Sequence, residues 1–94
     1  MFARNDWYLI QAKLALSPRE LEIVQHVFED QTEVEIGLRL GISQHTVHTY
    51  LRRTYRKLNV DSRCQLLVRV MEAYLSEHQA APIQEQDGSQ RRIG

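Results

Sequence analysis

The sequence predicts an all-α protein, with a four-helix domain over residues 17–76 and a short extra helix within residues 1–16. Two observations carry this prediction. No proline interrupts the chain between Pro18 and Pro82, and apolar residues recur there at helical rather than alternating spacing. The stretch is also divided by Ser, Thr and Gly residues of the kind that begin and end helices.

A short helix is expected ahead of the domain. Asn5 or Asp6 would cap its first turn. Three apolar side chains then share one face of this helix, at Trp7, Ile10 and Leu14.

The first two helices of the domain have strong start signals. Ser17 is the N-cap of the first, followed by proline at the first helical position and by Glu20, which completes a capping box. Thr32 caps the second helix, and Gly41 is expected to end it in the left-handed conformation. Gly37 inside that helix costs about 1 kcal/mol of helix propensity, a cost that close packing would explain.

Two further helices complete the domain. Ser43 caps the third, predicted over residues 44–58, and Ser62 caps the fourth, which covers RCQLLVRVMEAYL. Residues 77–94 are polar, contain Pro and Gly, and lack periodicity. We therefore expect disorder from about residue 79.

Charge is distributed unevenly along a chain whose net charge is zero. Residues 39–63 carry six basic side chains against the single acid Asp61, whereas residues 17–38 carry six acids against the single base Arg19. A neutral total argues against nonspecific coating of nucleic acid. A local basic segment is what one DNA-reading helix would contribute.

Several function classes are excluded by what the sequence lacks. No apolar run reaches the roughly 18–20 residues that span a bilayer, and no signal-peptide pattern is present. The single cysteine, Cys64, fits a reducing cytoplasm. His45 and His48 lack the further ligands of a zinc site, and no nucleophile motif or phosphate loop occurs, so we expect no metal, no cofactor and no enzyme.

The predicted second and third helices, with the short Gly-containing turn between them, form a helix-turn-helix. Projected at about 100° per residue, the third helix has an apolar face and an opposite basic face rich in hydrogen-bond donors. The apolar face comprises Val47, Leu51, Thr54, Tyr55 and Leu58. The basic face comprises His45, His48, Thr49, Arg52 and Arg56.

Residues from Leu16 to about Leu66 strongly resemble the LuxR-type (GerE/NarL-like) DNA-binding domain. The resemblance rests on LSPRELEIV, EIGLRLGIS, TVHTYLRR, YRKL and the Val60 and Arg63 of VDSR, all in the family's order. It implies a four-helix domain whose third helix enters the major groove of double-stranded DNA. It also implies that the fourth helix commonly pairs two protomers on a twofold-symmetric site.

Candidate site residues follow from the basic face and the resemblance together. The residues expected to read bases are His45, His48, Thr49, Tyr50 and Arg52. The residues expected to bind phosphates are Thr32, Ser43, Thr46, Arg53, Arg56 and Lys57. The chain departs from the family at three positions: Val34 replaces a usual basic residue, Tyr50 a frequent histidine, and Thr54 an aliphatic residue of the core.

The fourth helix has more apolar surface than one face toward a small core would use. We expect a homodimer through a second stripe, formed by Cys64, Leu67, Met71 and Tyr74. In the alternative, the helix that contains Trp7 folds back over this stripe.

The expected function is that of a sequence-specific transcriptional regulator in the bacterial cytoplasm, with RNA polymerase as a candidate second partner. Two alternatives stay open: a helix-turn-helix-shaped module that binds protein, and a promoter-reading domain like that of a sigma factor. Met1 and the helix at Trp7 favour a stand-alone regulator over an excised C-terminal domain.

Overall fold

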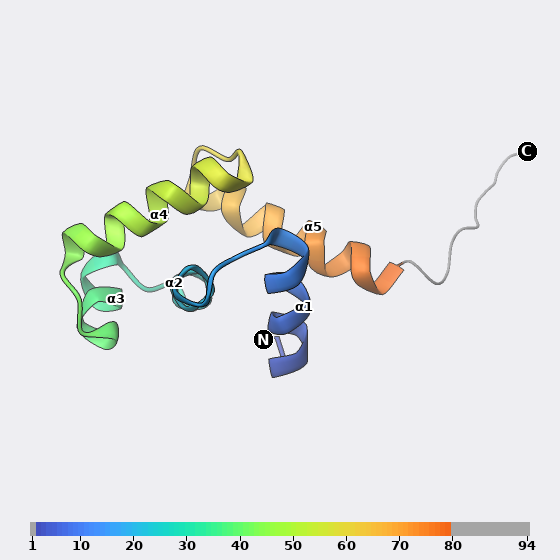
Figure 1. Cartoon of the computed structure of the whole chain (residues 1–94), viewed down its shortest axis with the longest axis horizontal. Coiled ribbons are helices and arrows are strands. Elements are labelled where there is room, and N and C mark those ends of the chain that lie inside the picture. The colour runs from blue at the N-terminus through green and yellow to red at the C-terminus, as the bar shows by residue number, and fades with distance from the viewer. Residues whose placement is uncertain (1, 80–94) are drawn as a thin grey trace, which may run out of the picture.

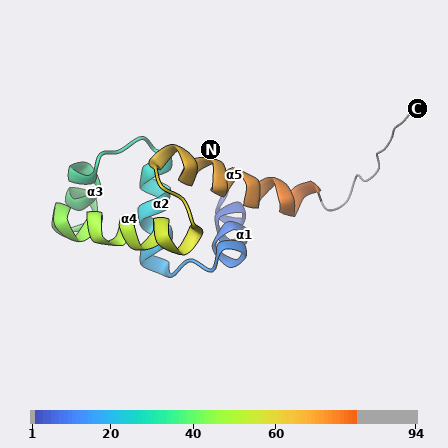
Figure 2. The same ribbon diagram turned by 90° about the horizontal axis from the view of Figure 1, so that it is seen from above.

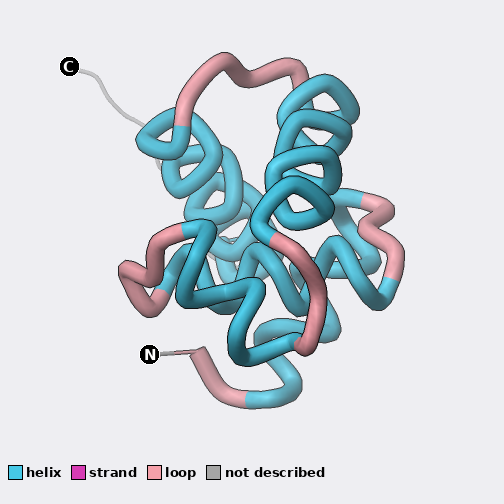
Figure 3. Tube along the Cα trace, turned by 90° about the vertical axis from the view of Figure 1, so that its left-hand side faces the viewer, coloured by secondary structure: helices cyan, strands magenta, loops and turns pink. Residues whose placement is uncertain are grey.

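The described part of the chain, residues 2–79 of a computed structural model, consists of helices joined by short loops, with no strand among these residues (Figures 1 and 3). The helices are α1 (Arg4–Leu14), α2 (Pro18–Phe28), α3 (Glu33–Leu40), α4 (Gln44–Leu58) and α5 (Arg63–Gln79). The all-α prediction is confirmed. The predicted disorder from about residue 79 falls almost wholly outside the described residues.

The domain's helices begin where their capping residues were expected. Ser17 Oγ accepts a hydrogen bond from the backbone N–H of Glu20 at 3.1 Å, and Glu20 Oε1 accepts one from the backbone N–H of Ser17 at 2.9 Å. Thr32 and Glu35 make the same pair of bonds, at 3.2 and 2.8 Å. These reciprocal bonds satisfy donors that have no partner within a helix, and they place both helix starts.

Two boundaries differ from the prediction. α1 begins at Arg4, so neither Asn5 nor Asp6 is its cap. Asp6 instead lies in the first turn, where its carboxylate accepts a hydrogen bond from the backbone N–H of Ala3 at 2.9 Å. α5 continues to Gln79, beyond Leu75, where the predicted helix RCQLLVRVMEAYL ends.

The turn between α3 and α4 depends on two glycines. Gly41 ends α3 with φ 71° and ψ 32°, the left-handed conformation expected from the sequence. Gly37 lies beneath the turn, and a Cβ placed there would be 2.7 Å from the carbonyl oxygen of Ile42. The close approach that was expected at Gly37 is therefore with the backbone of the turn that leads to α4.

The helices pack around α2 (Figures 1 and 2). α4 crosses α2 on one side and contacts α3 along its N-terminal half, whereas α1 lies against α5 at the other end of the molecule. Apolar side chains from all five helices fill the interior. The most completely buried are Ile10, Ile23, Val24, Val27, Ile36, Val47, Leu66 and Val70. This core holds α4 with one face inward and the other toward solvent.

An aromatic cluster attaches α1 to the rest of the domain. The ring centroid of Phe2 lies 5.0 Å from Trp7, 5.5 Å from Phe28 and 4.6 Å from Tyr74, and Trp7 also meets Phe28 edge-on at 5.3 Å. These contacts join the N-terminal segment to α2 and α5. The N-terminal segment thus covers part of the apolar stripe of α5 that was predicted to form the dimer. This agrees with the alternative in which the helix that contains Trp7 folds back over that stripe.

Candidate nucleic-acid interface

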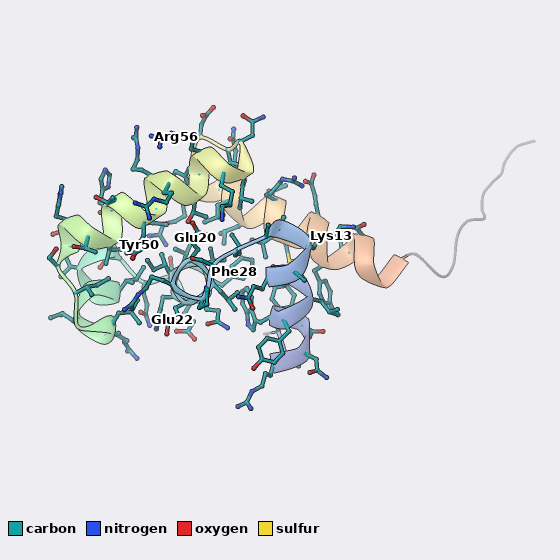
Figure 4. All side chains as sticks on the ribbon, in the orientation of Figure 1. Lys13, Glu20, Glu22, Phe28, Tyr50 and Arg56 are labelled. Carbon is teal, nitrogen blue, oxygen red and sulfur yellow. The ribbon has the colours of Figure 1, made fainter. Side chains whose placement is uncertain are left out.

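α4 presents the polar face that its sequence predicted. Val47, Leu51 and Leu58 are buried on its inner side, together with Thr54. Its outer side chains project away from the domain, as Arg56 does in Figure 4. Apart from Gln44 and Lys57, the exposed ones are His45, His48, Thr49, Arg52, Arg53 and Arg56. All six are positions predicted to contact bases or phosphates, and they share one exposed surface.

Thr54 is accommodated in the core by a local hydrogen bond. Its side chain is fully buried, and Oγ1 donates to the carbonyl oxygen of Tyr50 at 2.9 Å. A buried hydroxyl with a partner avoids most of the cost of losing water. The hydrogen bond therefore offsets part of the cost of burying a hydroxyl where the family usually has an aliphatic side chain.

The three arginines of this surface keep their charges available. Within residues 2–79, none of Arg52, Arg53 and Arg56 takes part in an ion pair, and α4 itself contains no acidic residue. The guanidinium carbon of Arg53 lies 5.3 Å from the ring centroid of the half-buried Tyr50. This cation–π contact orients Arg53 without neutralising it.

A hollow at the C-terminal end of this surface is bordered by Arg52, Arg56 and Asn59. The half-buried Tyr55 also lines it. Burial raises the pKa of the Tyr55 hydroxyl, with the charge of Arg63 acting in the opposite direction. The phenol therefore remains neutral at physiological pH, in a hollow that Arg52 and Arg56 share with the carboxylate of Asp61.

Lys57 lies differently from the arginines. Its Nζ is 2.7 Å from Glu20 Oε1 and donates a second hydrogen bond, of 2.9 Å, to the carbonyl oxygen of Ala15. Glu20 lies between α2 and α4 (Figure 4), and its side chain is only 4% exposed. Sequence reasoning identified Glu20 only as a capping residue, because its partner on α4 is 37 positions away. The ammonium that was expected to bind phosphate is thus engaged within the protein.

The pKa of Glu20 reflects this pairing. Burial alone would raise it, but the hydrogen bonds from Lys57 and Ser17 and the charge of Lys57 together outweigh burial. The pKa of this carboxyl therefore lies below its ordinary value. Glu20 is ionised at neutral pH and holds α2 to the last turn of α4.

A second side-chain contact links α3 to the exposed surface. His48 Nδ1 lies 3.1 Å from Glu33 Oε2, and both groups are accessible to solvent. Glu33 is an acid in the first turn of α3, where the helix dipole favours negative charge. Its distance of 15 positions from His48 gave no local signal of a contact.

The predicted hydroxyl contacts to phosphate have local partners. Ser43 Oγ accepts from the backbone N–H of Thr46 at 3.0 Å and lies 2.9 Å from Thr46 Oγ1. Thr32 caps α3, and Thr49 Oγ1 donates to the carbonyl oxygen of His45 at 3.1 Å. A hydroxyl that accepts at a cap can still donate its hydrogen to an anion. Ser43 and Thr32 lie at the N-termini of α4 and α3, where backbone dipoles also favour anions.

The predicted dimer residues of α5 are divided between two surroundings. Cys64 is exposed, Met71 is half-buried, and Leu67 and Tyr74 pack against the protein's own core. Two other apolar side chains of α5, Val68 and Leu75, were not among the predicted dimer residues. They are 52% and 42% exposed, more than Leu67, Met71 or Tyr74. Cys64 and Val68 border a small apolar hollow, whose other lining residues are Val60, Gln65, Arg69 and Glu72.

Two other kinds of site were sought in the same part of the chain. No helix among residues 2–79 has the length and apolar character needed to cross a membrane. Within the same residues, no group of three or more His, Cys, Asp or Glu side chains is arranged to hold a metal ion.

Comparison with known proteins identifies the family of the chain. Residues 14–70 match the family described as bacterial regulatory proteins, luxR family. The spore germination protein GerE of Bacillus subtilis is 34% identical over 61 residues, which is 65% of this chain and 82% of GerE. The regulatory protein SdiA of Escherichia coli is 31% identical over 62 residues, or 66% of this chain and 26% of SdiA.

A further relative carries the name "Probable HTH-type transcriptional regulator GfsR", from Streptomyces halstedii. It is 41% identical over 56 residues, which is 60% of this chain and 23% of GfsR. The chain therefore spans most of GerE but only about a quarter of GfsR and of SdiA. No solved structure matches the chain significantly.

Proposed function

The chain belongs to the luxR family of bacterial regulatory proteins, and we propose that it is a transcriptional regulator that reads double-stranded DNA by placing α4 in the major groove. The observation that carries this proposal is the exposed face of α4, whose three arginines make no ion pair within residues 2–79 and which has no acid on the helix. An α-helix fits the width of the major groove, and arginine is well suited to guanine edges and to phosphates.

The roles of individual side chains follow from their position on α4. Arg52 hydrogen-bonds a guanine edge or a neighbouring phosphate, while His48 and Thr49 contact bases, flanked by His45 and Tyr50. The remaining contacts hold the phosphate backbone. They come from Arg53 and Arg56 as charges, and from Thr32, Ser43 and Thr46 as neutral donors. Lys57 is assigned to its pair with Glu20 rather than to DNA.

The regulator acts as a homodimer through α5 in this proposal. The interface uses the exposed Cys64 and Val68 with the half-buried Met71, while Leu67 and Tyr74 stay in the protein's own core. Two recognition helices about 34 Å apart would then bind a palindromic site. Pairing also supplies affinity, because one small domain contacts few phosphates. We place this activity in the bacterial cytoplasm, with RNA polymerase as a second partner.

Arg52→Ala tests the docking face. Arg4→Ala is the matched control, because Arg4 is an exposed arginine on α1, at the other end of the molecule. Binding of randomised duplex DNA is measured by gel retardation and selection at low and moderate salt. Arg52→Ala is expected to weaken binding by about 1–3 kcal/mol and to relax the preference at one base position, whereas Arg4→Ala does neither.

Unchanged affinity and unchanged preference in Arg52→Ala would refute the docking face. If the wild-type protein bound no DNA at either salt concentration, the alternative of a protein-binding module would be favoured instead. Sedimentation of the free protein and of the DNA complex measures the dimer. A monomer in both states would refute the proposed pairing through α5.

A further inference from the structure

Glu33 and His48 form a contact that joins the start of α3 to the second turn of α4, on its exposed face. Glu33 is the first residue of α3, and its Oε2 lies 3.1 Å from His48 Nδ1. The side chains are 29% and 52% exposed, so water reaches both and the imidazole remains open toward a ligand. The carboxylate therefore fixes one edge of a base-contacting ring and leaves its other edge free.

The chemistry of this contact determines which nitrogen carries the hydrogen. An ionised carboxylate only accepts hydrogen bonds, so Nδ1 must be the donor toward Glu33. In a neutral imidazole the other nitrogen, Nε2, is then an acceptor. The two nitrogens lie on different edges of the ring, so Nε2 points away from Glu33.

We propose that Glu33 is a positioning residue for DNA specificity, which holds His48 as an acceptor for the amino group of adenine or cytosine. In the major groove, adenine N6 and cytosine N4 are donors, whereas guanine and thymine offer acceptors at the corresponding positions. The proposal rests on the docking of α4 described above. It adds that a residue outside α4 determines which bases His48 accepts.

The charge of Glu33 has a separate effect on binding. A carboxylate beside the DNA-facing surface repels phosphates, so its removal should raise affinity for any DNA sequence. Orientation of His48, in contrast, affects the preference at one base position only. Because these two effects differ in kind, two substitutions of Glu33 can separate them.

The variants are Glu33→Gln, Glu33→Ala and His48→Ala, compared with the wild type by selection from randomised duplex DNA. The assay is run at pH 8, well above the ordinary pKa of imidazole. The carbonyl oxygen of Gln can accept the same Nδ1 hydrogen, whereas Ala cannot. Thermal unfolding followed by circular dichroism verifies that each variant is folded.

In the wild type, one position of each half-site is expected to favour adenine or cytosine by about 2- to 10-fold, the range of a single neutral hydrogen bond. His48→Ala identifies this position by losing the preference. Glu33→Ala loses it at the same position, and Glu33→Gln keeps it. Both Glu33 variants bind nonspecific DNA more tightly than the wild type, because both remove the charge.

Three results would overturn the proposal while DNA binding itself remains. These are a preference retained in Glu33→Ala, an equal loss in Glu33→Gln and Glu33→Ala, or a His48→Ala variant with no changed position. Absence of DNA binding by the wild-type protein would refute the proposed function, and this inference with it.

Discussion

Substitution of Lys57 by Met tests how much the ion pair with the buried carboxylate of Glu20 contributes to the free energy of unfolding. Met keeps the apolar stem of the side chain but removes the ammonium, which lies 2.7 Å from Glu20 Oε1 and 2.9 Å from the carbonyl oxygen of Ala15. The carboxylate would then keep its hydrogen bond from the backbone N–H of Ser17 and lose its counter-ion.

The expected loss in the free energy of unfolding is about 2 kcal/mol. Breaking a fully buried ion pair costs about 3–5 kcal/mol, but the Lys57 side chain is 37% exposed, so water weakens this pair. A hydrogen bond to a charged group, worth about 1.5–3 kcal/mol, is the nearer comparison. For a domain of this size, a loss of about 2 kcal/mol lowers the melting temperature by about 8–16 °C.

The loss also depends on pH. Because the pKa of Glu20 in the folded protein lies below its ordinary value of 4.5, its contribution to stability is present above that value and is lost as pH falls through the folded pKa. Lys57→Met removes this contribution. The difference in melting temperature between wild type and variant should therefore be largest at pH 7 and shrink below pH 4.5.

Thermal unfolding followed by circular dichroism at several pH values measures both effects. The double variant Glu20→Gln, Lys57→Met is the matched control, because the amide can still accept from Ser17 without leaving a buried charge. It should melt at a higher temperature than Lys57→Met alone. The reasoning would be refuted if Lys57→Met melted with the wild type at pH 7, or if the double variant gave no recovery.

Three further substitutions test the turn, the phosphate contacts and the dimer. Gly37→Ala places a Cβ 2.7 Å from the Ile42 carbonyl oxygen and should lower the free energy of unfolding by about 1–3 kcal/mol, as measured by chemical denaturation. A denaturation curve equal to that of the wild type would exclude the clash. Arg56→Ala should reduce the slope of log affinity against log salt concentration by about one for each protomer bound, as measured by DNA titration. An unchanged slope would show that Arg56 does not contact a phosphate. Val68→Asp should weaken DNA binding and shift sedimentation to the monomer without lowering the melting temperature, and a dimer in that variant would exclude this face of α5.

The sequence was informative where the determining interactions are local. Ser17 and Thr32 form capping boxes with residues three positions away, and Gly41 ends α3 through its own backbone conformation. The two faces of α4 likewise follow from helical periodicity alone. Helices and the exposed surface of α4 could therefore be predicted before any tertiary contact was known.

Interactions between distant parts of the chain were not predicted. Lys57 resembled its basic neighbours in sequence, and only the packing of α2 against α4 brings it to Glu20. Glu33 meets His48 because the turn folds α3 back along α4. In the helical projection, Tyr74 and Met71 lie on the same apolar stripe. In the structure, the ring of Tyr74 packs against Phe2, a contact that the projection could not show. A helical projection shows which face a residue occupies, but it contains no information on what lies opposite.

The aromatic cluster at the base of α1 gives the protein a built-in optical probe. The chain contains one tryptophan, Trp7, and its indole lies edge-on to both Phe2 and Phe28, between α1 and α2. Its fluorescence therefore reports whether α1 is docked on the domain. Far-ultraviolet circular dichroism, in contrast, reports the helices together. Melting curves recorded by both signals on one sample would show directly whether the N-terminal helix detaches before the DNA-binding domain unfolds.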